Sequence, residues 1–286
     1  MESQRQHKQT FSFELFPPKT NEGMAKLQLT VRKLAEVEPL YFSVTYGAGG
    51  STRDRTLETV DWLRSESIAT APHLSCIGLH KEEILELLQH YKSQGITRLV
   101  ALRGDMPSGM GDTGDFPYAN ELVEFIRAEI GDHFHLEVAA YPEFHPQAPN
   151  AKTDLENFKR KVNAGANGAI TQYFYNADSY FNFVDSCEKL GIDIPIVPGI
   201  MPINNYAQLA RFSDACGAEI PRWLRKRLEE FDEDLESIRA FGLDVVTEMC
   251  QRLLDQGAPG LHFYTMNQAE LTLALWNNLG LSDKAS

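Results

Sequence analysis

The sequence has few cations, few cysteines and no long apolar run. In 286 residues, Lys and Arg number 27 against 40 Asp and Glu, a formal net charge of -13. This balance disfavours general binding to nucleic acid, which depends on neutralising phosphates. No apolar stretch reaches the roughly 18 residues that span a bilayer, and the opening MESQRQHKQT lacks the apolar stretch of a secretory signal. We therefore expect a cytoplasmic protein whose partners include neither a membrane nor a nucleic acid.

The cysteines and glycines do not form the usual metal or phosphate motifs. No CxxC pair occurs among the four cysteines, Cys76, Cys187, Cys216 and Cys250, which indicates free thiols in a reducing compartment and disfavours a structural zinc site. The GAGGS loop at 47–51 lacks GxGxxG spacing and a Walker lysine. His73 and His145 could pair on a metal, but no third ligand stands at a recognisable spacing, so we expect no metal.

Eight apolar, strand-like runs alternate with amphipathic stretches of helical period. The runs cover 10–16, 40–46, 68–75, 97–104, 134–141, 168–175, 194–200 and 260–265. The helical stretches cover 22–37, 54–65, 80–95, 119–131, 154–166, 177–191, 204–217 and 220–257. Eight such units predict an α/β protein, a (β/α)8 TIM barrel with 1–286 as one domain, and a doubly wound sheet is the weaker alternative. Residues 220–257 exceed one helix, so we expect extra helices after the seventh strand.

Polar residues stand at the C-terminal ends of seven of the eight predicted strands. Barrel active sites are built at that end, whereas polar residues at the other end usually serve stability. They are Glu14, Thr45, His73, Asp105, Tyr141 with His145, Gln172, and Tyr264 with Asn267. Any one of them alone is more simply a solvated loop residue. Their convergence on one mouth of the barrel predicts a functional site.

Eight runs at these strand ends resemble, in order, those of the bacterial, catalytic-domain-only 5,10-methylenetetrahydrofolate reductases. They are FELFPPK, SVTYGAGGSTRDRT, PHLSCIG, VALRGD, AAYPEFHP, DLENFKRKVNAGANGAITQYFY, PGIMPINNYAQLARF and HFYTMN. The resemblance implies an FAD-containing barrel that passes hydride from NADH or NADPH to the flavin and then to methylenetetrahydrofolate, in a ping-pong sequence that feeds methionine synthesis. It further implies a homo-oligomer and, because it is to the catalytic-domain-only form, no control by S-adenosylmethionine.

The resemblance implies two catalytic carboxyl groups. Reduction of methylenetetrahydrofolate needs its five-membered ring opened, and a carboxylic acid among apolar neighbours can protonate the departing nitrogen. The resemblance gives this role to Glu14, for which a solvated strand-end carboxylate is the alternative. It places Asp105 beside the flavin's pyrimidine edge and the pterin, where a negative charge disfavours the anionic reduced flavin. A salt bridge from Asp105 to Arg103 or Arg53 would be compatible with that.

The resemblance also implies binding residues. For FAD they are Tyr46, Ala48, His73, Arg103, Gly104, Asp105, Tyr141, His145, Asp154, Asn157, Arg160 and Lys161. For the folate and the nicotinamide they are Thr45, Gln172, Gln208, Phe212 and Gln268. Without the resemblance, DLENFKRK is a solvated charged helix face and Phe212 is core packing. Some bacterial relatives carry Arg where Gln268 stands, and a Gln can bond the folate's glutamate tail only as a neutral partner.

Two other functions stay open at this point. A barrel lyase or aldolase would need a lysine for a Schiff base or a metal cluster, and no lysine stands at a predicted strand end. A non-catalytic barrel that binds flavin or folate would carry out no hydride transfer. The residues leave the choice between NADH and NADPH open.

Overall fold

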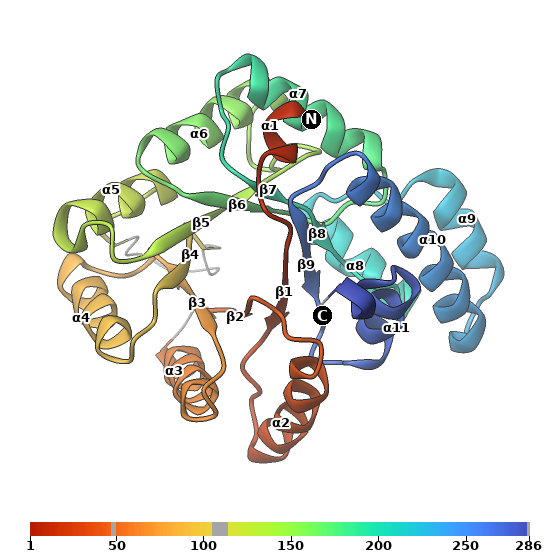
Figure 1. The fold of residues 1–286 in the computed structure, drawn as a ribbon, viewed down its shortest axis with the longest axis horizontal. Helices are drawn as coiled ribbons and strands as arrows, with labels where there is room; N and C mark the ends of the chain where they lie inside the picture. The colour runs from red at the N-terminus through yellow and green to blue at the C-terminus, as the bar shows by residue number, and fades with distance from the viewer. Residues whose placement is uncertain (47–49, 105–113, 285–286) are drawn as a thin grey trace.

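Parallel strands form the centre of the molecule, and helices surround them (Figure 1). The computed structural model describes residues 1–46, 50–104 and 114–284. Its strands are β1 Thr10–Leu15, β2 Tyr41–Val44, β3 Thr70–Ser75, β4 Arg98–Leu102, β5 His135–Ala140, β6 Gly168–Thr171, β7 Ile196–Val197, β8 Gly199–Ile200 and β9 Gly260–Tyr264. They follow the order β7-β6-β5-β4-β3-β2-β1-β9-β8, and every pairing in that order is parallel.

The predicted seventh strand is present as two short strands. β7 pairs with β6 and β8 pairs with β9, and only Pro198 separates β7 from β8. Proline has no N–H for a strand ladder, and the Pro198 carbonyl accepts a hydrogen bond of 2.9 Å from the backbone of His262. This broken strand joins the two ends of the sheet and nearly closes it. The predicted (β/α)8 barrel is therefore confirmed, with its seventh strand interrupted by proline.

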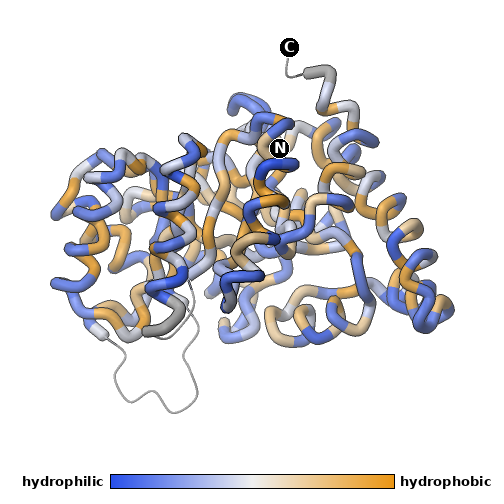
Figure 2. Tube along the Cα trace, turned by 90° about the horizontal axis from the view of Figure 1, so that it is seen from below, coloured by the Kyte–Doolittle hydropathy of each residue, from blue (hydrophilic) through white to orange (hydrophobic). Residues whose placement is uncertain are grey.

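The helices lie between successive strands and around the barrel. They are α1 Glu2–Arg5, α2 Asn21–Ala35, α3 Gly50–Ser65, α4 Lys81–Ser93, α5 Ala119–Ile130, α6 Ala151–Asn163, α7 Ala177–Lys189, α8 Tyr206–Cys216, α9 Arg222–Glu230, α10 Leu235–Asp255, α11 Glu270–Asn278 and the 3-10 helix η1 Leu281–Lys284. Helices α8, α9 and α10 all fall between β8 and β9, so the expected extra helices are present. Hydrophilic and hydrophobic residues alternate along the outer helices, as amphipathic helices require (Figure 2).

Several helices begin at a side chain that accepts a hydrogen bond from the first turn. Such N-caps satisfy backbone N–H groups that have no partner within the helix. The capping residues are Thr20, Asn150, Asn176, Asn205 and Asp234. The cap at Asn150 explains why α6 starts at Ala151, three residues before the predicted start.

The two faces of the barrel strands bury different kinds of side chain. On β1, Phe13 and Leu15 are fully buried in the large apolar core. Successive strand residues point to opposite faces, so Ser12 and Glu14 point into the barrel. The apolar cluster inside the barrel is small, with Tyr41 among its four buried members. Polar side chains therefore share the barrel interior, as the alternation in FSFE indicates.

The short helix α1 is fastened to the start of β7 by a buried glutamine. Gln4 is fully buried; its Nε2 donates to the carbonyl of Ile194 at 3.1 Å, and its Oε1 accepts from the N–H of Ile196 at 2.7 Å. Gln4→Ala should therefore lower the free energy of unfolding by about 1–3 kcal/mol, because both backbone groups lose their partners. Urea denaturation measures this. The exposed neighbour supplies the control: Gln6→Ala should change stability by less than about 0.5 kcal/mol, and equal losses in the two variants would refute the role of Gln4.

Candidate active site

The carboxyl group of Glu14 lies beside two buried imidazoles at the C-terminal end of the barrel. Its Oε2 is 3.4 Å from Nε2 of His73 on β3 and 3.7 Å from Nε2 of His262 on β9. The Glu14 side chain is 20% exposed, against 8% for His73 and 0% for His262. The carboxyl group thus contacts the barrel interior and is still reached by solvent. These contacts favour a site residue over the alternative of a merely solvated strand-end carboxylate.

His73 is neutral at physiological pH. Burial lowers its pKa to about 4, although the neighbouring Glu14 carboxylate opposes the shift. Its Nε2 makes no hydrogen bond of normal geometry within the described residues. A neutral imidazole can donate or accept at this nitrogen, depending on its tautomer. His73 therefore provides Glu14 with an uncharged polar neighbour, not with a cation.

The C-terminal end of β4 brings the backbone close to its neighbours. The carbonyl of Arg103 accepts a 2.8 Å hydrogen bond from the hydroxyl of Ser75. Gly104 has φ +86°, and a Cβ there would lie 1.8 Å from the same hydroxyl oxygen, so only glycine fits. The Arg103 guanidinium donates to Gln147 at 2.5 Å, in the loop after β5. This places a cation between the ends of β4 and β5.

The loop after β5 forms a connected group around His145. The rings of Tyr141 and His145 meet edge to face at 4.6 Å. The backbone N–H of His145 donates to Asp154 at 2.9 Å, and its Nδ1 accepts from the N–H of Gln147 at 3.0 Å. Because Gln147 also binds Arg103, the structure brings four predicted site residues into one corner of the mouth.

The polar residues of helix α6 point in two directions, toward solvent and toward β5. The amide oxygen of Asn157 accepts a 3.0 Å hydrogen bond from Arg160, which is exposed. The Nζ of Lys161 donates instead to the carbonyl of Ala139 on β5 at 2.5 Å. Burial lowers the pKa of Lys161 to about 8, against the charge of Asp154. The solvated-face alternative therefore holds for Arg160 and is wrong for Lys161.

The remaining predicted binding residues lie at other strand ends. The Thr45 carbonyl accepts from Thr56 at 3.1 Å, and Tyr46, half-buried, packs against the core, where burial raises its pKa. The side-chain oxygen of Gln172 accepts from the backbone of Tyr173 at 3.0 Å. Gln172 also lines a small hollow together with Tyr141, which joins the β6 end to the β5 corner.

Three predicted residues stand apart from the Glu14 group. Gln208 lies in the first turn of α8, and Phe212 follows one turn later and is 40% exposed. That exposure makes the core-packing alternative for Phe212 wrong. Gln268 is exposed in the loop after β9. No hydrogen bond or ion pair joins these side chains to Glu14 in the parts of the chain that the structure covers. The predicted residues Ala48 and Asp105 lie outside the described residues.

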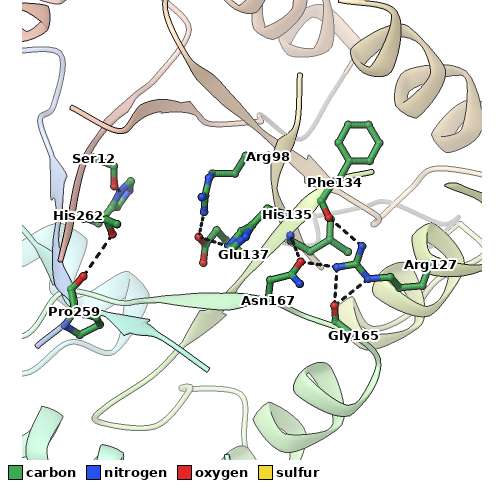
Figure 3. A network of polar contacts seen from close by, with 12 residues as sticks. Ser12, Arg98, Arg127, Phe134, His135, Glu137, Gly165, Asn167, Pro259 and His262 are labelled. Carbon is green, nitrogen blue, oxygen red and sulfur yellow. Dashed lines mark hydrogen bonds and ion pairs between the residues drawn. The ribbon is translucent and has the colours of Figure 1, made fainter. Parts of the chain in front are cut away.

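The expectation that site residues stand at the C-terminal ends of strands missed two residues of the barrel interior. Ser12 Oγ lies 2.7 Å from Nδ1 of His262, and both side chains are buried (Figure 3). The sequence carries a signal for them: Ser12 precedes Glu14 by two residues and His262 precedes Tyr264 by two. Residues two apart on a strand share a face, so both belong to the layer just below the mouth.

The described residues hold neither a metal-binding cluster nor a membrane-spanning helix. Among residues 1–46, 50–104 and 114–284, no three His, Cys, Asp or Glu side chains are grouped to hold a metal ion. In the same ranges no helix combines the length and apolarity that crossing a bilayer requires.

The fold and the site define a (β/α)8 barrel with a carboxyl group beside two buried imidazoles at its mouth, the end at which barrel enzymes build their active sites. The methylenetetrahydrofolate reductase family model matches residues 1–280. The 5,10-methylenetetrahydrofolate reductase of Escherichia coli (strain K12) is 41% identical over 271 residues, covering 94% of this chain and 90% of that protein. A probable methylenetetrahydrofolate reductase (NADH) of Oryza sativa subsp. japonica is 41% identical over 289 residues, covering 96% of this chain and 49% of its own length. The chain belongs to the methylenetetrahydrofolate reductase family and is an oxidoreductase.

Two solved structures are similar in fold. An uncharacterized protein from Clostridium thermocellum, described as binding two copies of 5-methyl-5,6,7,8-tetrahydrofolic acid, matches with a TM-score of 0.70 and 16% identity over 99% of this chain and 98% of its own. The thermostable aldo-keto reductase Tm1743 matches with a TM-score of 0.53 and 12% identity over 96% and 94%. At these identities the matches support the barrel and not a function.

Proposed function

We propose that this chain reduces 5,10-methylenetetrahydrofolate to 5-methyltetrahydrofolate with hydride from NADH or NADPH, carried by FAD in two half-reactions. The contact of Glu14 Oε2 with two buried imidazoles at the barrel mouth carries the proposal. Family membership supports it, and the protein from Clostridium thermocellum that shares the fold is described as binding a folate. The product would feed methionine synthesis, and the enzyme would be a cytoplasmic homo-oligomer.

Glu14 is the proposed proton donor. Opening the five-membered ring needs a proton on the departing nitrogen, and a general acid must hold that proton in the working pH range. His73, with a pKa of about 4, does not hold one at neutral pH. Glu14 is half-buried and reaches the mouth, and its carboxyl group lies beside two buried imidazoles. It is therefore the group best suited to protonate the substrate.

The residues around the ends of β4 and β5 fit FAD. Arg103 and Arg160 supply cations. Gly104, whose missing side chain makes room for the side chain of Ser75, is proposed to contact FAD through its backbone. The Nζ of Lys161 donates to a backbone carbonyl, so its other N–H groups can bind an anionic diphosphate. Tyr46, Ala48, His73, Asp105, Tyr141, His145, Asp154 and Asn157 complete the proposed FAD site. When bound, FAD supplies an acceptor and donor of two electrons as hydride.

The folate and the nicotinamide are proposed to use the rest of the mouth. Gln172 has both a donor and an acceptor for a pterin or an amide. Phe212, exposed on α8 beside Gln208, offers an aromatic face to a planar ring. Thr45 and Gln268 complete the proposed substrate residues, with Gln268 a neutral partner for the glutamate tail. Asp105 is the proposed second catalytic carboxylate.

FAD should bind more weakly as the pH rises above about 8. Burial lowers the pKa of Lys161 from 10.5 to about 8. A bound anion favours the charged ammonium and raises this pKa, so binding takes up a proton at pH values above 8. Affinity should fall by up to roughly tenfold between pH 7 and pH 9, measured by quenching of flavin fluorescence. In Lys161→Met the affinity for FAD should be lower and should not change with pH. In Arg160→Met the affinity should still fall as the pH rises. A slope that persists in Lys161→Met would contradict this role.

An anaerobic stopped-flow experiment tests the function. Protein loaded with FAD is mixed with NADH or NADPH, and the reduced enzyme is then mixed with methylenetetrahydrofolate. We expect bleaching of the flavin in the first step and recovery of its colour in the second, with 5-methyltetrahydrofolate as the product. A protein that binds no FAD, or whose bound flavin is not reduced by either nicotinamide, would refute the proposal and favour a non-catalytic barrel.

A further inference from the structure

Three side chains contact the imidazole of His262 inside the barrel. Ser12 Oγ lies 2.7 Å from its Nδ1, and Figure 3 draws the two side chains next to each other. The ring of Tyr41 stacks on it with centroids 6.2 Å apart, and the ring of Tyr264 meets it edge on at 5.4 Å. His262 is fully buried. Its orientation is therefore set by three neighbours from three strands.

The neighbour on the mouth side of His262 is fixed in turn. The Tyr264 hydroxyl donates to the carbonyl of Thr171 at 2.7 Å. Gly199, opposite His262 in the sheet, leaves the space that Tyr264 fills, because a Cβ at Gly199 would lie 2.6 Å from the tyrosine ring. Gly199, next to Pro198 in the broken strand, thus leaves room for the ring of Tyr264, which contacts His262.

The free nitrogen of His262 points to Glu14. Its Nε2 lies 3.7 Å from Glu14 Oε2 and makes no hydrogen bond of normal geometry in the residues that the structure describes. Ser12 can donate its hydroxyl hydrogen to Nδ1, which puts the ring hydrogen on Nε2. That hydrogen then faces the carboxyl group of Glu14, and the imidazole itself stays uncharged.

We infer that His262, oriented by Ser12, is a positioning residue that holds one oxygen of the Glu14 carboxyl group and leaves the other to face the substrate. This inference rests on the proposed function for the step it affects. The Nε2–H of His262 donates to the carboxylate that remains after Glu14 has given its proton to the folate nitrogen. A misplacement of about 1 Å in such a group can cost on the order of 10²-fold in rate.

The other titratable groups around the pair do not carry charge at neutral pH. They are Tyr41 on β2, His73 on β3 and Tyr264 on β9. Burial raises the pKa of both tyrosines and lowers that of His73 to about 4. These three side chains therefore add no charge beside Glu14 and His262 at neutral pH.

Two substitutions separate the two nitrogens of His262. His262→Asn keeps an amide near the Nδ1 position and removes the group facing Glu14, whereas His262→Gln places an amide near the Nε2 position. We expect His262→Asn to slow reoxidation of the flavin by methylenetetrahydrofolate roughly 10- to 100-fold, with little change in reduction by the nicotinamide. His262→Gln should recover most of the loss. His90→Asn, on the outer helix α4, is the control and should match the wild type in both steps.

Equal rates in His262→Asn and His262→Gln, or equal slowing of both half-reactions, would overturn the inference. A second measurement needs neither FAD nor activity: nitrogen-15 NMR of the imidazoles in the cofactor-free wild type at pH 8. We expect His262 as the neutral Nε2–H tautomer, and a charged ring or the Nδ1–H tautomer would overturn the inference. If the wild type itself carries out neither half-reaction, the proposed function fails, and the NMR result still decides whether His262 donates to Glu14.

Discussion

Glu14→Gln should leave reduction of the flavin by the nicotinamide intact and slow its reoxidation by methylenetetrahydrofolate by roughly 10²- to 10⁴-fold. Glutamine has nearly the same shape as protonated glutamic acid, but its amide does not act as a general acid. Only the folate step needs a proton on a departing nitrogen. Anaerobic stopped-flow absorbance of the flavin measures each half-reaction separately.

The substitution also tests whether the effect is chemical. The amide introduced by Glu14→Gln can still contact the imidazoles of His73 and His262, which lie 3.4 and 3.7 Å from Glu14 Oε2, so the barrel interior keeps its partners. Glu22→Gln, an exposed change in the first turn of α2, is the matched control and should behave as the wild type. If Glu14→Gln slows both half-reactions by the same factor, Glu14 is not the acid of the folate step.

The barrel architecture could be predicted because residues that face the helices alternate with residues that face the interior along each strand. In FSFEL, phenylalanine and leucine face the helices and Ser12 and Glu14 face the interior, which a period of two encodes. The broken seventh strand could not be predicted in detail, because Pro198 interrupts pairing only once β6 and β9 lie on either side. Helix α1 was missed for a similar reason: four residues show no periodicity, and Gln4 identifies the segment only through its tertiary hydrogen bonds.

The sequence allowed us to predict which site residues stand at strand ends, but not which of their side chains touch. Glu14 and His73 were both expected at the mouth, and the structure brings their side chains together from β1 and β3. The contact with His262 depends on closure of the sheet between β1 and β9, which are about 250 residues apart in sequence. Such a contact can be seen only in the folded barrel, because sequence spacing does not indicate it.

Arg98→Met should lower the free energy of unfolding by about 3–5 kcal/mol, because it leaves a buried carboxylate without its cation. Arg98 on β4 forms an ion pair with Glu137 on β5, whose side chain is only 5% exposed. His135 lies 3.1 Å from the same carboxylate oxygen (Figure 3). The other oxygen, Glu137 Oε2, has no partner within the described chain, and a Cβ at Gly168 would lie 2.4 Å from it. Urea denaturation at pH 8, where unperturbed imidazoles are neutral, measures the loss.

The double variant separates the buried charge from lost packing. Arg98 also stacks its guanidinium over the ring of Tyr41 at 4.8 Å, a contact that Met replaces only in part. If most of the stability lost in Arg98→Met comes from the unpaired carboxylate, adding Glu137→Gln should recover more than half of that loss. The reason is that a neutral amide costs far less to bury than a carboxylate. A loss below about 1 kcal/mol, or a double variant no more stable than Arg98→Met, would mean that this ion pair does not stabilise the barrel.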